Sequence, residues 1–216
     1  SEKIFIGLVM LKWIYIYGPP RTGSTYLLRQ IRKKSIHSVS DWGLGVILKP
    51  FVAMPGGIDK DRFLCDLAKN LLDRSRKNEQ GELDLVLKAA NGNFEEFEGY
   101  KKMFGFPQRI IFTVREPSGY MSSAIKKFPE EPVEFLQDSY LKMLQLYPSI
   151  GGDIIDYNQN LGSQCYQKFL LPLEFPDNEI ETFEYKGTPA EHLITDEMKN
   201  SYQEFLRENQ DKVFKP

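Results

Sequence analysis

Two patterns of apolar residues alternate along this chain. Short continuous apolar runs are typical of buried strands, and longer segments with apolar residues every three or four positions are typical of amphipathic helices. The expected strands are Ile4 to Tyr17, Leu83 to Ala89, Arg109 to Val114 and Asp153 to Tyr157. The expected helices are Ser24 to Lys34, Asp59 to Lys77, Phe94 to Phe104, Pro132 to Tyr147 (ended by Pro148), Ser163 to Leu171 and Asp196 to Glu208. This alternation predicts an α/β fold, doubly wound in three layers around a mainly parallel sheet of about five strands.

The first strand runs into a loop, Y-G-P-P-R-T-G-S-T, that has the spacing of a phosphate-binding Walker A motif. Gly18 and Gly23 keep the two glycine positions and Thr25 keeps the hydroxyl, but Ser24 stands where the motif has lysine. That lysine normally reaches the terminal phosphates of a triphosphate, and the hydroxyl binds its Mg²⁺. The loop carries one cation, Arg21. Its loss of the lysine therefore favours a phosphate ligand other than ATP or GTP.

Parallel α/β sheets bind ligands at the carboxyl ends of their strands, so the residues that follow each strand are candidates for function. Lys88 lies near the end of the second expected strand, L-D-L-V-L-K-A, and Arg115 directly follows the third expected strand, R-I-I-F-T-V. The helix expected from Ser24 places the loop amides at a helix N-terminus, where the helix dipole favours an anion.

At these positions the chain resembles the PAPS-dependent sulfotransferases, which use 3′-phosphoadenosine 5′-phosphosulfate (PAPS). The loop P-P-R-T-G-S-T-Y-L is similar to their 5′-phosphosulfate loop. The stretch F-T-V-R-E-P-S-G-Y-M-S-S resembles their 3′-phosphate motif, an arginine followed by a serine eight residues later, which selects Arg115 and Ser123. Two weaker similarities, I-I-D-Y-N-Q-N and Y-K-G-T-P, follow in the family's order.

The resemblance implies a P-loop-like nucleotide-binding fold in a single domain, residues 1–216, and a set of donor-binding residues. The 5′-phosphate would be held by amides and hydroxyls of Thr22, Gly23, Ser24 and Thr25, together with Arg21, and the 3′-phosphate by Arg115 and Ser123. Tyr157 would contact the adenine, and Lys186 and Gly187 would belong to a loop that closes over the nucleotide. No metal is expected, because PAPS needs no clamp for a magnesium triphosphate, and the product is adenosine 3′,5′-bisphosphate.

The resemblance also implies catalytic roles. Arg21 would neutralise charge on the bridging oxygen, but an arginine is fixed in its charge and is poorly suited to donate a proton. Cytosolic relatives use a histidine as base in a K-T-H segment, where this chain has L-K-A-A-N with Ala90 at the histidine position. Another branch uses a carboxylate about twenty residues after the loop cation, which points to Asp41, with His37 as second candidate. Lys88 would contact the sulfuryl oxygens.

Composition narrows the setting. The chain has 216 residues, 41% hydrophobic and 27% charged, with a formal net charge of -2. It lacks the basic excess of a general nucleic-acid binder. Cys65 and Cys165 are far apart and suggest neither a disulfide framework nor a zinc site, which favours a reduced, cytoplasmic setting. Lys12 interrupts the first apolar run, which is too short to span a bilayer, so no membrane span is expected.

Two other functions stay open on these residues. A divergent P-loop kinase could use Arg21 in place of the loop lysine, and it would need an acidic residue at a strand end. A binding module that kept the nucleotide fold without catalysis would account for Ala90. The acceptor of a transferase could be a small molecule, glycan, lipid or peptide, since such sites are built by variable loops, here Ser38 to Gly57 and Phe128 to Tyr147.

Overall fold

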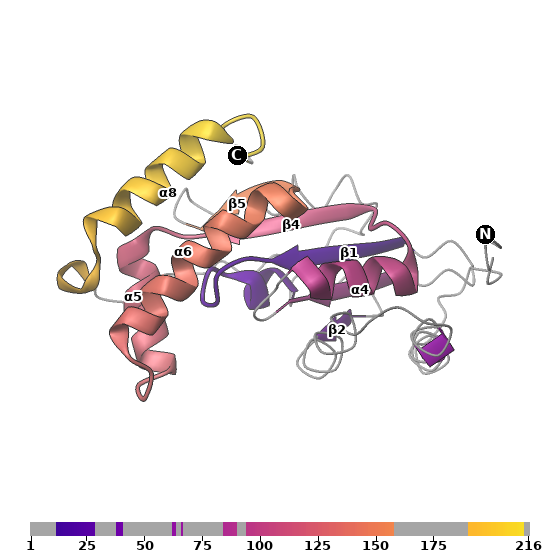
Figure 1. Ribbon diagram of the computed structural model, residues 1–216, viewed down its shortest axis with the longest axis horizontal. Coiled ribbons are helices and arrows are strands. Elements are labelled where there is room, and N and C mark those ends of the chain that lie inside the picture. The colour runs from indigo at the N-terminus through magenta and orange to yellow at the C-terminus, as the bar shows by residue number, and fades with distance from the viewer. Residues whose placement is uncertain are drawn as a thin grey trace, which may run out of the picture.

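The computed structural model describes residues 12–28, 38–40, 62–63, 66, 84–89, 94–157 and 190–213 (Figure 1). Its strands are β1 (Lys12–Tyr17), β2 (Ser38–Ser40), β3 (Asp84–Lys88), β4 (Arg109–Val114) and β5 (Asp153–Asp156). Its helices are α4 (Phe94–Phe104), α5 (Pro117–Lys127), α6 (Val133–Ile150), the 3-10 helix η2 (Glu191–Leu193) and α8 (Asp196–Glu208). Residues 24–28 are helical directly after the loop.

The strands form one five-stranded parallel sheet in the order β2-β3-β1-β4-β5, which confirms the predicted α/β class. In the register, Ile16 of β1 lies opposite Lys88 of β3, and Tyr17 lies opposite Phe112 of β4. From β1 the chain continues to β2 on one side of the sheet, and from β4 it continues to β5 on the other. In open α/β sheets, ligands bind where the connections from two neighbouring strands leave towards opposite sides of the sheet. The expected site therefore lies beyond the carboxyl ends of β1 and β4.

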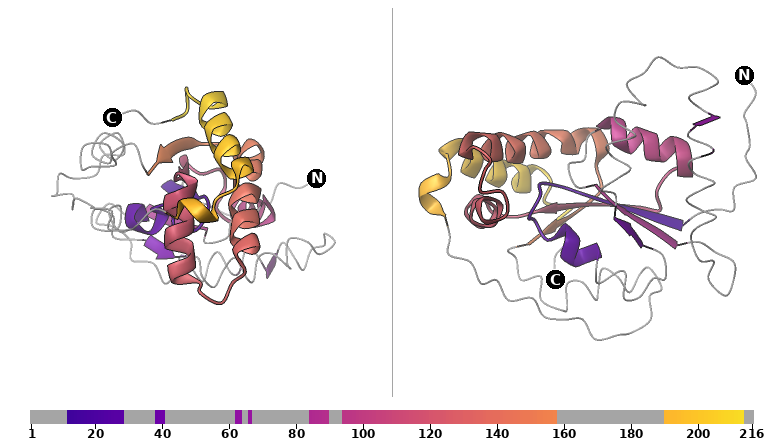
Figure 2. Two further views of the ribbon diagram at one scale, coloured as in Figure 1. Left: turned by 90° about the vertical axis from the view of Figure 1, so that its left-hand side faces the viewer. Right: turned by 90° about the horizontal axis from the view of Figure 1, so that it is seen from below.

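The two faces of β1 carry different side chains. Trp13, Tyr15 and Tyr17 point to one face, where they join a buried aromatic cluster with residues of α4, α6 and α8. The Tyr15 ring lies 5.1 Å from that of Phe97 in α4 and 5.6 Å from that of Tyr17. Figure 2 shows α4, α6 and α8 on this face and the helical residues 24–28 on the other. The alternation of a buried strand thus serves two helical layers.

Most predicted element bounds in the described part agree with the structure. The strand 109–114 and the helices 94–104 and 196–208 are confirmed, and β3 and β5 lie within their predicted ranges. The prediction that Pro148 ends its helix is wrong, because α6 continues to Ile150. A proline near a helix end removes only one hydrogen bond, and Ile150 is buried in the core. The helix ends instead at Gly151, which has a φ of 74° and donates its amide to the Tyr147 carbonyl at 2.7 Å.

Other predicted elements fall outside this part of the chain. The helix expected at 163–171 and the residues before Lys12 lie outside the described residues, and of the helix expected at 59–77 only Arg62, Phe63 and Asp66 are described, as helical. None of the helices in the described segments is long and apolar enough to cross a membrane.

Candidate functional site

The loop after β1 has an unusual backbone. Gly18, Arg21 and Gly23 have φ values of 144°, 70° and 89°. A side chain on Gly18 would overlap the Thr113 carbonyl oxygen of β4, so glycine lets the loop pass close to that strand. Arg21 is exposed and is the one non-glycine residue with positive φ among the described residues. Such conformations cluster at functional sites, because the surrounding structure must hold them.

The Thr22 side chain fixes the loop to the sheet. Thr22 is 1% exposed, and its hydroxyl donates to the Pro19 carbonyl at 2.7 Å. The same oxygen lies 2.7 Å from the Thr113 hydroxyl of β4. A threonine hydroxyl has one hydrogen to donate, and here it is used within the fold. In this arrangement the hydroxyl has no hydrogen left to donate to the 5′-phosphate, and the contact of Thr22 with that phosphate stays a prediction.

The next residues begin a helix at the loop. The Leu27 amide donates to the Gly23 carbonyl at 2.9 Å, so Gly23 precedes the first turn. The amides at the start of a helix have no partner within it and point towards its N-terminal end. Thr25 is exposed, whereas Ser24 is 6% exposed. Of the predicted ligands Ser24 and Thr25, Thr25 is thus the more accessible to a bound anion.

Arg21 and Ser123 come together although 102 positions separate them. The Arg21 Nε donates to the Ser123 Oγ at 3.0 Å. Ser123 lies in α5, the helix that follows β4. The sequence assigned the loop of Arg21 and the helix of Ser123 to the two ends of one nucleotide. In the structure the two segments lie side by side, beyond the carboxyl ends of β1 and β4.

Arg115 directly follows β4 and is 4% exposed. Its guanidinium carbon lies 4.7 Å from the centre of the Tyr157 ring, a cation–π arrangement. Gly119 of α5 makes room for this side chain, since a Cβ there would lie 2.6 Å from Arg115 Nε and 2.5 Å from Glu116 Oε1. Sequence reasoning missed Gly119. Its signal was a glycine inside a helix, which is unfavourable unless packing requires it.

Tyr157 contacts both the loop after β1 and Arg115. Its amide donates to the Val114 carbonyl at 2.8 Å, which extends the pairing of β4 and β5. A Cβ on Gly23 would overlap the ring and lie 2.7 Å from its Cε2 atom. In the structure the Tyr157 ring contacts both the loop at Gly23 and the Arg115 guanidinium. The predicted contact of Tyr157 with the adenine stays a prediction.

Lys88 ends β3, the strand on the other side of β1. It is half-buried and lies opposite Ile16 in the register. The three neighbouring strands β3, β1 and β4 therefore end in, or run into, Lys88, Arg21 and Arg115. Four predicted site residues, Asp41, His37, Lys186 and Gly187, lie outside the described residues.

Sequence reasoning treated Tyr140 of α6 as part of an apolar helix stripe. It is fully buried, and its hydroxyl donates to the Arg115 carbonyl at 2.6 Å. Burial raises the pKa of Tyr140 well above its usual value of 10.0, with the negative charges of neighbouring groups acting in the same direction. The hydroxyl consequently stays protonated and available as a donor. The apolar stripe predicted that Tyr140 is buried, but it did not predict which group its hydroxyl bonds to.

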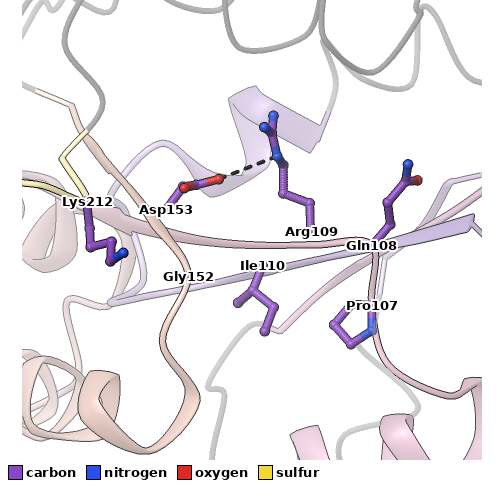
Figure 3. A pocket seen from close by; sticks show the side chains of 7 residues that line it. All are labelled: Pro107, Gln108, Arg109, Ile110, Gly152, Asp153 and Lys212. Atoms are coloured by element: carbon purple, nitrogen blue, oxygen red, sulfur yellow. Dashed lines mark ion pairs between the residues drawn. The ribbon is translucent and has the colours of Figure 1, made fainter.

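A separate hollow of about 340 Å³ lies at the opposite end of the sheet, where β4 and β5 begin (Figure 3). Arg109 and Asp153, the first residues of these strands, line it and form an ion pair at 3.4 Å. Lys212 lines it from the segment after α8. Because it lies at the amino ends of the strands, this hollow is distinct from the loop site.

Comparison with known proteins identifies the fold. No protein-family model matches the chain, and no curated protein matches it in sequence. Among solved structures, the chain is similar to the sulfotransferase domain of the Synechococcus PCC 7002 olefin synthase, with a TM-score of 0.52 and 15% identity over 79% of this chain and 76% of that one. It is more distantly similar to a sugar kinase from Janibacter sp. HTCC2649 (TM-score 0.40, 13% identity, 76% and 95% covered). A shikimate kinase from Bacteroides thetaiotaomicron gives a TM-score of 0.43 at 13% identity, with 76% and 99% covered. Together with the loop after β1, the similarity to the sulfotransferase domain indicates a P-loop-like α/β fold.

Proposed function

We propose that the protein is a sulfotransferase that moves a sulfuryl group from PAPS to a hydroxyl or amine acceptor. The observation that carries this proposal is the set of cations at the carboxyl ends of three adjacent strands: Lys88 at the end of β3, Arg21 after β1 and Arg115 after β4. A donor with two separated anionic groups fits this arrangement. The fold shared with a sulfotransferase domain supports it.

Each residue has a stated task in this proposal. The loop amides from Thr22 to Thr25 would hold the 5′-phosphate, and Arg115 with Ser123 would hold the 3′-phosphate. PAPS supplies the activated sulfuryl group. As the acceptor oxygen or nitrogen bonds to sulfur and the bridging S–O bond breaks, Arg21 would stabilise the negative charge left on the phosphate. Asp41 would take the proton of the acceptor.

The ends of β3 and β4, the two strands that flank β1, also argue against a kinase. Magnesium-dependent P-loop enzymes hold their metal with an acidic residue at the end of a strand in addition to the loop hydroxyl. The two strands that flank β1 here run into Lys88 and Arg115. A cation at each of these positions would repel Mg²⁺ and attract a metal-free anionic ligand.

Calorimetric titration with adenosine 3′,5′-bisphosphate tests the proposal. The purified protein should bind this nucleotide in the presence of a metal chelator. Absence of binding at high micromolar nucleotide, or a requirement for Mg²⁺, would refute the PAPS site. A protein that binds the nucleotide but leaves PAPS intact over many hydroxyl and amine acceptors would be a binding module.

Replacing Arg115 tests the assigned 3′-phosphate site. The variant Arg115→Ala should bind the bisphosphate about ten- to a hundredfold more weakly, the range expected for charge-assisted hydrogen bonds. Adenosine 5′-phosphate, which lacks the 3′-phosphate, is the control ligand, and its affinity should change little. An unchanged affinity for the bisphosphate would show that its 3′-phosphate binds elsewhere.

A further inference from the structure

Two tyrosines join α5 and α6 in a reciprocal way. Tyr120 of α5 donates its hydroxyl to the Leu136 carbonyl of α6 at 2.9 Å. Tyr140 of α6 donates to the carbonyl of Arg115, two residues before α5 begins, at 2.6 Å. Both side chains are fully buried, and their ring centres are 4.8 Å apart. The two helices lie side by side in Figures 1 and 2. Tyr120 thus bonds to the backbone of α6, and Tyr140 bonds to the backbone just before α5.

The acceptor of Tyr140 lies at a transition in the backbone. On one side, the bond from the Tyr157 amide to the Val114 carbonyl extends the sheet. On the other, the bond from the Tyr120 amide to the Glu116 carbonyl at 3.0 Å belongs to the start of α5. The Arg115 carbonyl lies between these two bonds. The Tyr140 hydroxyl of α6 donates to this carbonyl and fixes its position.

From this geometry we propose that Tyr140 is a positioning residue that acts through Arg115 and sets the preference for nucleotides with a 3′-phosphate. The inference rests on the proposed function, in which Arg115 binds that phosphate. The hydroxyl fixes the peptide from which the Arg115 side chain departs, and Tyr157 and the space at Gly119 fix where its guanidinium ends. Removing the Tyr140 hydroxyl removes the bond to the Arg115 carbonyl, whereas Tyr157 and the space at Gly119 still position the guanidinium.

The same chain offers a matched control. Tyr147 of α6 is also buried and donates its hydroxyl to a backbone carbonyl, that of Gly152, at 2.7 Å. Gly152 precedes β5, at the end of the sheet away from the loop. The variants Tyr140→Phe and Tyr147→Phe therefore remove the same kind of bond from the same helix. They differ in whether the acceptor belongs to the candidate site.

The test compares the dissociation constants of adenosine 3′,5′-bisphosphate and adenosine 5′-phosphate, measured by calorimetry for the full chain. Tyr140→Phe should lower the preference for the bisphosphate about three- to tenfold, the effect of losing one well-placed hydrogen bond, and leave the affinity for the monophosphate nearly unchanged. Tyr147→Phe should leave the preference unchanged. In an Arg115→Met background, adding Tyr140→Phe should have no further effect on the preference.

Several outcomes would overturn the inference. An unchanged preference in Tyr140→Phe, with Arg115 still required for it, refutes the role of Tyr140 and leaves the proposed function intact. An equal loss for both nucleotides, or a Tyr140→Phe protein that does not fold, shows that the hydroxyl serves the fold in general. If the unaltered protein binds the bisphosphate no better than the monophosphate, the assigned 3′-phosphate site fails and the inference fails with it.

Discussion

Adding one methyl group at Gly119 tests whether the position of Arg115 matters. Gly119 lies in α5 with no unusual φ, so alanine is conformationally allowed there. The new Cβ would lie 2.6 Å from Arg115 Nε and 2.9 Å from its Nη2 atom. Since non-bonded heavy atoms are comfortable at about 3.5 Å, the guanidinium must retreat by roughly 0.9 Å. The Glu116 Oε1 atom, 2.5 Å from the same point, must also move.

The expected effects on stability oppose each other. Alanine is favoured over glycine inside a helix by about 0.5 to 1 kcal/mol. Moving the Arg115 guanidinium from its place 4.7 Å from the Tyr157 ring costs about 2 kcal/mol, because Arg115 is only 4% exposed. The thermal midpoint of Gly119→Ala should thus lie no more than about 6 °C below that of the unaltered protein.

The expected effect on binding is large. Charge-assisted hydrogen bonds to a phosphate contribute about 1.5 to 3 kcal/mol to binding. A displaced guanidinium loses much of this energy. The affinity for adenosine 3′,5′-bisphosphate should fall about tenfold, and that for adenosine 5′-phosphate should not. The assay is calorimetric titration of both nucleotides, with the thermal midpoint measured on the same samples.

Gly105→Ala is a control with the opposite pattern. Gly105 has a φ of 77°, and a Cβ there would meet nothing within 4 Å. Alanine in this conformation costs about 1 to 2 kcal/mol, so stability should fall while nucleotide affinity stays constant. If Gly119→Ala is folded and binds the bisphosphate within about twofold of the unaltered protein, the placement of Arg115 in the phosphate site is wrong.

Three further predictions concern the fold around the site. Thr22→Val should lower the free energy of unfolding in urea by about 1 to 3 kcal/mol, because the Pro19 carbonyl loses this donor and the Thr113 hydroxyl keeps the Tyr17 carbonyl at the longer distance of 3.5 Å. A loss below about 0.5 kcal/mol would contradict a stabilising role of these bonds. Burial raises the pKa of Tyr120 to about 12 from 10.0, so its contribution to stability is complete below pH 10 and is lost as the pH rises towards 12, by up to about 3 kcal/mol. Urea unfolding over this range should show a shallower decline in Tyr120→Phe than in the unaltered protein, and equal slopes would reject this assignment. Phe106→Ser should leave stability within about 0.5 kcal/mol and nucleotide affinity unchanged, since Phe106 is 74% exposed; a larger loss in the same assays would indicate a structural role for the ring.

Some parts of the site could be predicted from the sequence because they depend on local spacing. The glycines of the loop follow directly from an apolar run, and Arg115 and Ser123 are eight residues apart on a strand end and its following helix. Such short separations along the chain fix the relative positions of residues once the strand and the helix form. The hydrogen bond from Arg21 to Ser123 joins residues 102 positions apart, and neither local spacing nor the resemblance to a family predicted it.

Other features depended on how elements pack against one another. Thr22 and Thr25 look equivalent in the loop, yet one hydroxyl is bound to β4 and the other residue is exposed. Pro148 reads as a helix end, but burial of Ile150 outweighs one lost hydrogen bond. In both cases the outcome is set by contacts with another element, which a periodic pattern does not specify.

The sequence by itself determined the α/β class, the bounds of most described strands and helices, and the loop whose missing lysine favours an anion without a magnesium triphosphate. Only the tertiary structure decided that Tyr157 contacts both Gly23 and Arg115, that Gly119 makes space for a guanidinium, and that Tyr140 holds the Arg115 carbonyl. The physical reason is that periodicity and turn chemistry act between near neighbours in the chain. The partner of a buried hydroxyl or cation depends instead on strand order, register and side-chain direction, which are fixed when the whole core packs.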